Sequence, residues 1–192
     1  PAMTFSMLKT GNNIFVCNSG GVNVSTDNGI NWSAANTGIV DLNIRCFTLL
    51  GNTVYCGSYG GKIYKTTNNG ANWSDATGNL ATSNIRTLVV SGSNVFAGSD
   101  AGAFITTNGG SNWSTVSSGL SGTSVNTFCV NGSVIFAGTP AGVFQTSNNG
   151  TLWSYYGGGL NNNTVLSIAV TGSNLFAGTN GGGVSLSQNS GG

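Results

Sequence analysis

Short apolar runs alternate with turns rich in Gly, Asn, Ser and Thr along the whole chain. In one stretch the runs cover residues 44–50, 53–57 and 62–66, and a mixed polar and apolar run follows at 72–76. We name these runs strands A, B, C and D, since runs of this length between Gly- and Asn-rich turns are typical of β-strands. Strands A and B are apolar on both faces, which suits strands covered by neighbours on both sides. No apolar spacing typical of a helix is sustained, so we predict an antiparallel four-stranded meander.

The meander recurs about every 40 residues, in copies at about 4–41, 42–81, 82–121, 122–160 and 161–192. A period near 40 in a chain of short strands predicts an all-β, five-bladed β-propeller of antiparallel four-stranded blades in a single domain, 1–192. The last blade would lack its outermost strand, because the fifth copy has no strand D.

A five-bladed ring is the simplest closure of these copies. The strand around Val184 and Leu186 would then be an unpaired edge, and edges of this kind can pair with another chain. Another chain could supply the missing strand, so self-association through the open edge of the last blade is one expectation. The other is that the chain is cut from a longer propeller.

A turn of the form Ser/Thr-x-Asp/Asn-x-Gly-x-x-Trp precedes strand D in four copies, and its tryptophans stand 41, 40 and 40 residues apart. The hydroxyl and the Asn or Asp side chain can hydrogen-bond within their own turn, Gly can take a positive φ, and Trp can pack between neighbouring sheets. We therefore assign a structural role to the residues of the four turns: Ser25, Asp27, Gly29, Trp32, Thr66, Asn68, Gly70, Trp73, Thr106, Asn108, Gly110, Trp113, Thr146, Asn148, Gly150 and Trp153.

This pattern resembles the Asp-box (BNR-like) repeat of sialidases, sortilin-type receptors and secreted bacterial propellers. The resemblance covers the whole chain, and it implies that the turns are scaffold on the face away from the ligand site. It also implies an extracellular or cell-surface protein, of bacterial origin. Only Asp27 keeps the acid of the motif, and Asn replaces it in the other copies, which preserves the hydrogen bonds but weakens any role in metal binding.

Charge is scarce: charged residues are 5% of the chain, against about 25% in a typical soluble protein, and the net charge is +1. So weak a field predicts no nucleic-acid partner, and no apolar run is long enough for membrane insertion. There is no His and no Glu, which removes Ser-His and Cys-His nucleophiles and the commonest zinc ligands. We predict no cofactor and no metal.

Cys17, Cys46, Cys56 and Cys129 do not recur with the repeat, so we interpret them as small apolar fillers. Cys46 and Cys56 flank a short hairpin turn. If residues 51 and 52 form the loop, Cys56 lies opposite Phe47 and Cys46 points to the other face. We therefore expect no disulfide between them.

Catalysis is not expected. The resemblance would suggest a sialidase, whose family needs three arginines and a Tyr–Glu pair, and this chain has two arginines and no Glu. Other glycosidases need two carboxylates that face one bond. Asp41 and Asp100 fall in connections on one face of the propeller, but solvated loop residues explain them as well.

The function predicted is a non-catalytic binding or structural scaffold module with an unknown protein or glycan ligand. The alternative is a carbohydrate-binding lectin, with sites on the face that carries the D–A and B–C connections. Arg45 and Arg86 share a repeat position and could hold an anion or a carboxylate, although capping of carbonyls or pairing with Asp41 would also account for them. The place of Tyr59 is not aromatic in the other copies, which argues against five equivalent sugar sites. Tyr155 and Tyr156 are a further candidate pair, but side chains alternate between the two faces of strand D, so one of the two would pack against a neighbouring sheet. The candidate ligand-binding residues are Asn43, Arg45, Tyr59, Asn84, Arg86, Asp100, Asn126 and Asn180.

Overall fold

Five antiparallel sheets, four of four strands and one of three, make up the computed structural model, which describes residues 3–82, 84–120 and 124–188. Each sheet is one blade of a five-bladed β-propeller. Blade 1 contains β1 (Ser6–Thr10), β2 (Asn13–Asn18), β3 (Gly21–Ser25) and β4 (Ser33–Ala34); blade 2 contains β5 (Ile44–Leu50), β6 (Thr53–Ser58), β7 (Ile63–Thr66) and β8 (Ser74–Asp75). Blade 3 contains β9 (Ile85–Ser91), β10 (Asn94–Ser99), β11 (Gly102–Thr106) and β12 (Ser114–Thr115); blade 4 contains β13 (Thr127–Asn131), β14 (Val134–Thr139), β15 (Gly142–Thr146) and β16 (Ser154–Tyr155). Blade 5 contains β17 (Val165–Thr171), β18 (Asn174–Thr179) and β19 (Gly183–Ser187).

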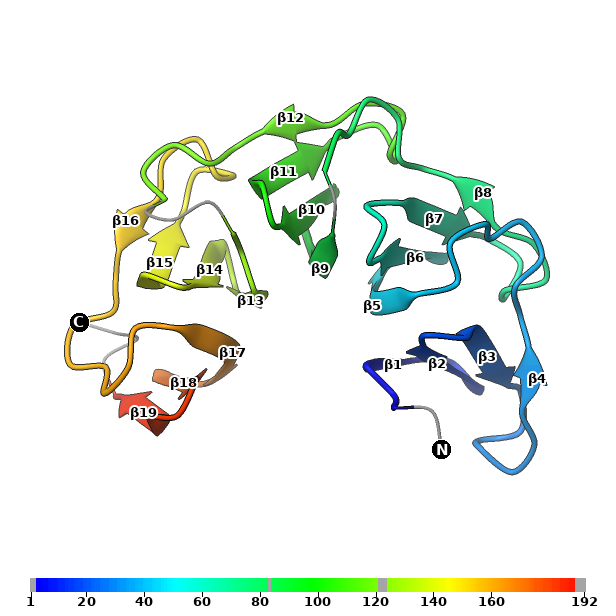
Figure 1. Ribbon diagram of the computed structural model, residues 1–192, viewed down its shortest axis with the longest axis horizontal. Coiled ribbons are helices and arrows are strands. Elements are labelled where there is room, and N and C mark those ends of the chain that lie inside the picture. Colours follow the sequence, from blue (N-terminus) through cyan, green and yellow to red (C-terminus); the bar gives the residue numbers. More distant parts are fainter. Residues whose placement is uncertain (1–2, 83, 121–123, 189–192) are drawn as a thin grey trace.

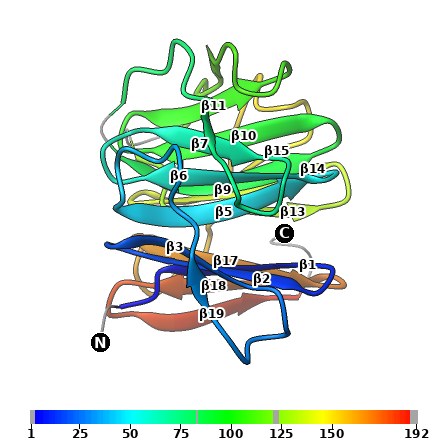
Figure 2. The same ribbon diagram turned by 90° about the vertical axis from the view of Figure 1, so that its right-hand side faces the viewer.

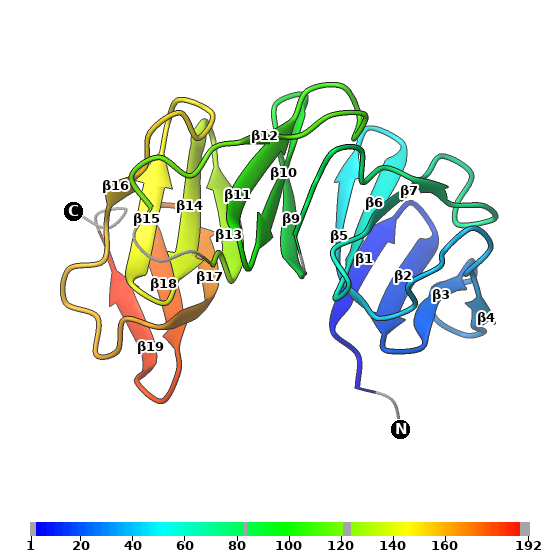
Figure 3. The ribbon, with the colours of Figure 1, turned by 45° about the horizontal axis from the view of Figure 1, so that its top comes forward.

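The blades fan out in an arc, with blades 1 and 5 at its two ends (Figures 1 and 3). Their inner strands pack in succession, β1 on β5, β5 on β9, β9 on β13 and β13 on β17. Within the described residues β17 is not packed on β1 in the same way, so the five blades do not close the ring that is simplest from the sequence. The predicted five blades and the three-stranded last blade are confirmed.

Strands run across the width of the arc, so that the connections collect at its two rims (Figure 2). Because each blade is an antiparallel meander, the B–C turns and D–A connections lie at one rim and the A–B and C–D turns at the other. The repeated turns are C–D turns. They therefore stand at the opposite rim from the face that the candidate ligand residues share.

Each repeated turn is held by its own side chains, as the pattern predicts. In blade 2 the Thr66 hydroxyl donates to Asn68 Oδ1 (2.8 Å) and accepts from the Gly70 amide (3.1 Å), while Asn68 Oδ1 also accepts from the Asn72 amide (3.0 Å). Asn thus does the work of the acid without its charge. Gly70 has a φ of +82°, and Asn69 before it has a φ of +58°, a conformation that Asn tolerates better than most residues.

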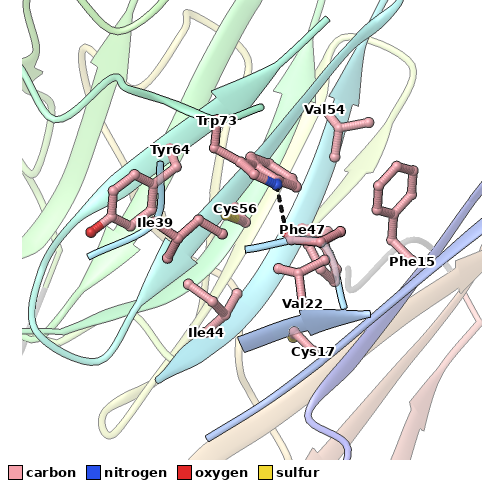
Figure 4. Close-up of a cluster of buried hydrophobic side chains, with 11 residues drawn as sticks. Phe15, Cys17, Val22, Ile39, Ile44, Phe47, Val54, Cys56, Tyr64 and Trp73 are labelled. Carbon is pink, nitrogen blue, oxygen red and sulfur yellow. Dashed lines mark hydrogen bonds between the residues drawn. The ribbon is translucent and has the colours of Figure 1, made fainter. Parts of the chain in front are cut away.

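Tryptophan joins successive blades. Trp73, Trp113 and Trp153 are only 2–4% exposed, and each indole N–H donates to a carbonyl of the preceding blade, those of Ala35, Ala76 and Val116. Figure 4 shows Trp73 between blades 1 and 2, among Phe15, Val22 and Phe47.

Trp32 departs from the prediction that all four tryptophans pack between sheets. It is 43% exposed, and its indole donates to Gly29 of its own turn (3.1 Å), because blade 1 has no preceding blade within the described chain.

Strand D is shorter than the predicted run 72–76, since β8 spans only Ser74–Asp75. The amide of Trp73 leaves the ladder and donates to Thr37 O of the preceding blade (2.8 Å). The outer strand therefore divides its backbone hydrogen bonds between two blades, which the apolar pattern alone does not reveal.

All four cysteines are free, and Cys17, Cys46 and Cys56 are buried. Phe47 is the register partner of Cys56, as expected, so that Cys46 lies on the other face of the sheet. Burial raises the pKa of the Cys17 thiol to about 12, which makes it an unreactive part of the core.

Candidate functional site

One repeat position from every blade lines a depression of about 370 Å³ at the centre of the arc. The position lies at the start of strand A, where the five copies carry Phe5, Arg45, Arg86, Asn126 and Leu166. Because strand A is the innermost strand of each blade, the fan brings these five side chains together from residues about 40 positions apart.

Three residues of the connections complete the depression. Tyr59 and Asp100 come from equivalent B–C turns, and Asn84 immediately precedes β9. The wall is therefore mixed, with aromatic, aliphatic, cationic and amide groups on one surface, as ligand pockets commonly are.

Arg45 is the cation of this site without a carboxylate partner. Its guanidinium carbon lies 4.1 Å from the centre of the Phe5 ring and 4.8 Å from that of Tyr59, two cation–π contacts. Its Nε is buried and has no hydrogen-bond partner among the described residues. The aromatic contacts fix the plane of the guanidinium while leaving a donor of the group unused.

The described residues contain neither an ion pair of Arg45 with Asp41 nor a hydrogen bond from Arg45 to a carbonyl, the two alternatives that the sequence left open. The Asp41 carboxylate instead accepts from the amides of Asn43 (3.1 Å) and Gly60 (2.8 Å) and shapes the B–C turn. Burial alone would raise the pKa of Asp41. Hydrogen bonds from Ser58, Asn43 and Gly60, with the charge of Arg45 nearby, outweigh burial and hold this pKa below its ordinary value.

Arg86 is engaged differently from Arg45, since its Nε donates to Asp100 Oδ1 at 2.5 Å. The two side chains are 40% and 34% exposed, so the pair contributes little to stability. Its effect is local, because Asp100 offsets one of the two positive charges. Asn126 is also held, as its Nδ2 donates to Val165 O of the next blade (2.8 Å).

Six of the eight candidate residues line the depression: Arg45, Tyr59, Asn84, Arg86, Asp100 and Asn126. Asn43 lies behind the wall, where its carbonyl accepts from the Tyr59 amide (2.8 Å). Asn180 is exposed outside it, and its carbonyl accepts from Asn162 (2.8 Å).

The sequence-based candidates did not include Phe5 and Leu166, because they were polar residues and an aromatic residue of a B–C turn, and no apolar residue of strand A was considered. The signal that finds them is the repeat register, since both occupy the position of Arg45 and Arg86. Of the tyrosine pair, Tyr155 is 52% exposed and Tyr156 packs on Phe136, as alternation predicted.

No group of three or more possible metal ligands occurs within residues 3–82, 84–120 and 124–188. In the same residues no helix could cross a membrane. Asp27 and Asp75 are each bound to their own turns, through Asn31 and Thr77 respectively. What the depression offers chemically is a fixed cation, an amide and an aromatic ring.

No family model matches the chain, and no curated protein matches it. Solved structures do, as a fold: YCF48 bound to D1 peptide (TM-score 0.76, 16% identity) covers 98% of this chain and 66% of that one. The laminin/nidogen complex (TM-score 0.72, 10% identity) covers 93% and 72%. The GH74 enzyme of Niastella koreensis (TM-score 0.70, 20% identity) covers 100% and 31%. The chain thus spans about two thirds of the YCF48 chain and under a third of that enzyme. These structures are β-propeller proteins, and the likeness shows the fold.

Proposed function

We propose that this protein is a non-catalytic binding module of a secreted Asp-box propeller, and that its central depression holds an acidic group of a protein partner. The observation that carries the proposal is Arg45. Its guanidinium contacts two aromatic rings, lacks a carboxylate partner among the described residues and has a buried Nε without a hydrogen-bond partner there. A cation held in this way is pre-organised for a carboxylate, since little rotamer freedom remains to be lost on binding.

The surroundings of Arg45 favour a peptide over a free ion. Phe5 and Leu166 give the depression apolar wall, and Asn84 contributes a buried Oδ1 without a partner among the described residues. A peptide can match all three with a carboxylate, an apolar side chain and an amide N–H. The structures of YCF48 bound to D1 peptide and of nidogen with laminin support a protein ligand, as each shows a similar propeller with a protein partner.

Absence of catalysis is part of the proposal. Each of the four aspartates is bound to its own turn or to Arg86, which does not favour the two opposed carboxylates that a glycosidase needs. The likeness to GH74 enzymes supports no activity here, because it stands at low identity over a minor part of those chains. Release of product from a fluorogenic sialoside would overturn this part of the proposal.

The test is a panel of short peptides with free C-terminal carboxylates, each paired with its amidated copy, titrated against the protein by fluorescence polarisation. We expect the free acids to bind at least about tenfold more tightly, because a hydrogen bond to a charged group contributes about 1.5–3 kcal/mol. Arg45→Gln should abolish the difference. Lys9→Gln removes the same charge from the far end of strand A and should preserve it.

The lectin remains the second candidate, supported by Tyr59, which is 52% exposed beside Asn84 and Asp100. An aromatic ring next to amide and carboxylate groups can stack on a sugar. A glycan array separates the two functions: binding of neutral glycans that Tyr59→Ala abolishes, with no peptide bound, would replace the acidic-peptide function by the lectin function. Amidated and free peptides that bind equally would also contradict the proposal.

A further inference from the structure

Blade 5 differs from the other blades at its outer edge. Blades 1–4 each end in a two-residue strand directly after a tryptophan, whereas the described part of blade 5 ends in β19. β19 pairs with β18 on one side, and its other edge is the one that β4, β8, β12 and β16 cover in the other blades. In four blades of this chain, the segment that pairs with the equivalent edge is thus a two-residue strand that follows a tryptophan.

The three blade junctions that hold a tryptophan show how such a segment is bound. Besides the indole bond to the preceding blade, the amides of Trp73 and Trp153 donate to Thr37 O and Ser118 O, both at 2.8 Å. The Trp113 amide donates instead to Asn79 Oδ1 (2.7 Å). Gly38 and Gly119 then pass so close to the following strand that a Cβ on either would overlap the carbonyl oxygen of Trp73 or Trp153. The D–A connections of blades 1 and 3 are thus sockets in which a glycine lies against the tryptophan of the next blade, whereas blade 2 has Asn79 at the place of that glycine.

Blade 4 has the same socket, formed by Tyr156, Gly158 and Gly159 at the places of Ala35, Thr37 and Gly38. Gly159 keeps the positive φ of its counterparts (+81°), although nothing lies within 4 Å of its Cβ position. A groove of about 50 Å³ lies between residues 157–160 and β19, and Leu186 is one of the β19 residues that line it. Blade 4 thus has the socket, but no described tryptophan lies against Gly159 as Trp73 and Trp153 lie against Gly38 and Gly119.

Tyr156 partly fills this socket. The equivalent residues are Ala35, Ala76 and Val116, which are small enough for a tryptophan to lie over them. The ring centre of Tyr156 lies 5.8 Å from that of Phe136, where the equivalent Phe15 has Trp73 at 6.3 Å (Figure 4). Tyr156 therefore stands in for the tryptophan that the other junctions have.

We propose that the groove between residues 157–160 and β19 binds an extended peptide strand with an Asn-Trp-Ser core. The strand pairs with the edge of β19 that no described strand covers, its indole N–H donates to Tyr156 O, and its Trp amide donates to Gly158 O. The side chain of Tyr156 swings away from Phe136 as the indole enters. This occupant is chosen because the same sequence, from Asn72 and Asn112 onward, fills the equivalent place in blades 2 and 3. The site is separate from the central depression and does not depend on the function proposed for it.

The experiment uses the full chain and a labelled synthetic peptide with the sequence of residues 110–116, Gly-Ser-Asn-Trp-Ser-Thr-Val. Fluorescence polarisation should show saturable binding, and replacement of the peptide's Trp by Ala should remove it. Tyr156→Ala should strengthen binding about tenfold, because the stand-in no longer competes with the indole. A merely structural role for Tyr156 would give no such gain.

Two glycine variants form the matched pair. Gly159→Ala should abolish binding, because its Cβ would occupy the place of the peptide's Trp carbonyl. Gly172→Ala, in the β17–β18 turn, also replaces a glycine of positive φ (+59°) in open surroundings, and it should bind normally. Unfolding curves check that both variants are folded.

Three results would overturn the proposal: binding that survives the loss of Trp, binding that Gly159→Ala leaves unchanged, and no binding to folded Tyr156→Ala. Sedimentation measures whether copies of the chain associate. If copies of the chain associate, by inserting the segment around Trp32 of one copy into the groove of another, the peptide should dissociate them. Association that excess peptide leaves intact would also contradict the proposal.

Discussion

Trp32 and Trp113 follow equivalent turns in two copies of the repeat, yet their side chains lie in different surroundings. Trp113 is 4% exposed and bonds to the carbonyl of Ala76 in the preceding blade, whereas Trp32 is 43% exposed and bonds to its own turn. The motif therefore builds the turn wherever it occurs, but it buries its tryptophan only where another blade precedes it. The turn is a local property of the sequence and the burial is a property of the neighbour.

The same contrast runs through the last blade. Val184 of β19 is 70% exposed, whereas its equivalents Val22 and Val143 are 0% and 1% exposed because the next blade covers them. In a chain of repeats, stability is close to a sum of the repeats and their nearest-neighbour interfaces. The end blades of this arc have one such interface and the inner blades have two, so equivalent substitutions should cost less in an end blade than in an inner one.

Removal of a tryptophan should give the largest effect. Trp113→Ala should lower the free energy of unfolding by about 3–5 kcal/mol, the usual cost of deleting a buried aromatic side chain, and it also leaves Ala76 O without its donor. Trp32→Ala should cost only about 1 kcal/mol, since much of its surface is already in water. Denaturant unfolding followed by circular dichroism measures both. Equal losses would mean that Trp32 is covered in solution, and the contrast would fail.

The close approach of blades at the socket glycines should give the next largest effect. A Cβ at Gly119 would overlap the carbonyl oxygen of Trp153, and φ there is +88°. Gly119→Ala should therefore cost about 2–4 kcal/mol, from backbone strain and overpacking together. Gly132→Ala, in a hairpin turn with φ +59° and open surroundings, has the strain alone and should cost about 1 kcal/mol. Similar midpoints for the two variants in urea would show that the junction yields to the methyl group.

The strands, the blade count and the turns could be predicted from the sequence because they depend on local patterns. The spacing of Trp73, Trp113 and Trp153 and the apolar runs of strands A and B are such patterns. Six of the candidate ligand residues were predictable for the same reason, since the repeat register shows which connections share a face. The whole lining was contained in that register, and Phe5 and Leu166 were missed only because apolar residues were not considered.

The remaining features depend on contacts between blades and on the angle at which they meet. Arg45 stacks on Phe5 of the preceding blade, a contact that no single copy contains, whereas Arg86 pairs with Asp100 of its own copy. The exposure of Trp32 and the opening of the arc follow from the geometry of the four junctions rather than from any one copy. The shortness of strand D has the same origin, because Trp73 bonds across the junction.

The smallest effect should come from the one acid among the repeated turns, which lies in end blade 1. Hydrogen bonds from the Asn31 amide and side chain and from Ser25 lower the pKa of Asp27 from 3.8 to about 2. A lowered folded-state pKa contributes stability that is present above pH 3.8 and is lost as the pH falls towards 2. Asp27→Asn should preserve the turn, as Asn68 does in blade 2, and should lose less stability between pH 5 and pH 2 than the parent chain.

Asn68→Asp should gain the same acid sensitivity in an inner blade, because Thr66 and the Asn72 amide would then face a carboxylate. Urea midpoints across this pH range measure both variants, and Asp41 and Asp75, whose pKa values are also lowered, contribute equally to each. An unchanged pH dependence in Asp27→Asn would show that the turn is held by its backbone and hydroxyl alone.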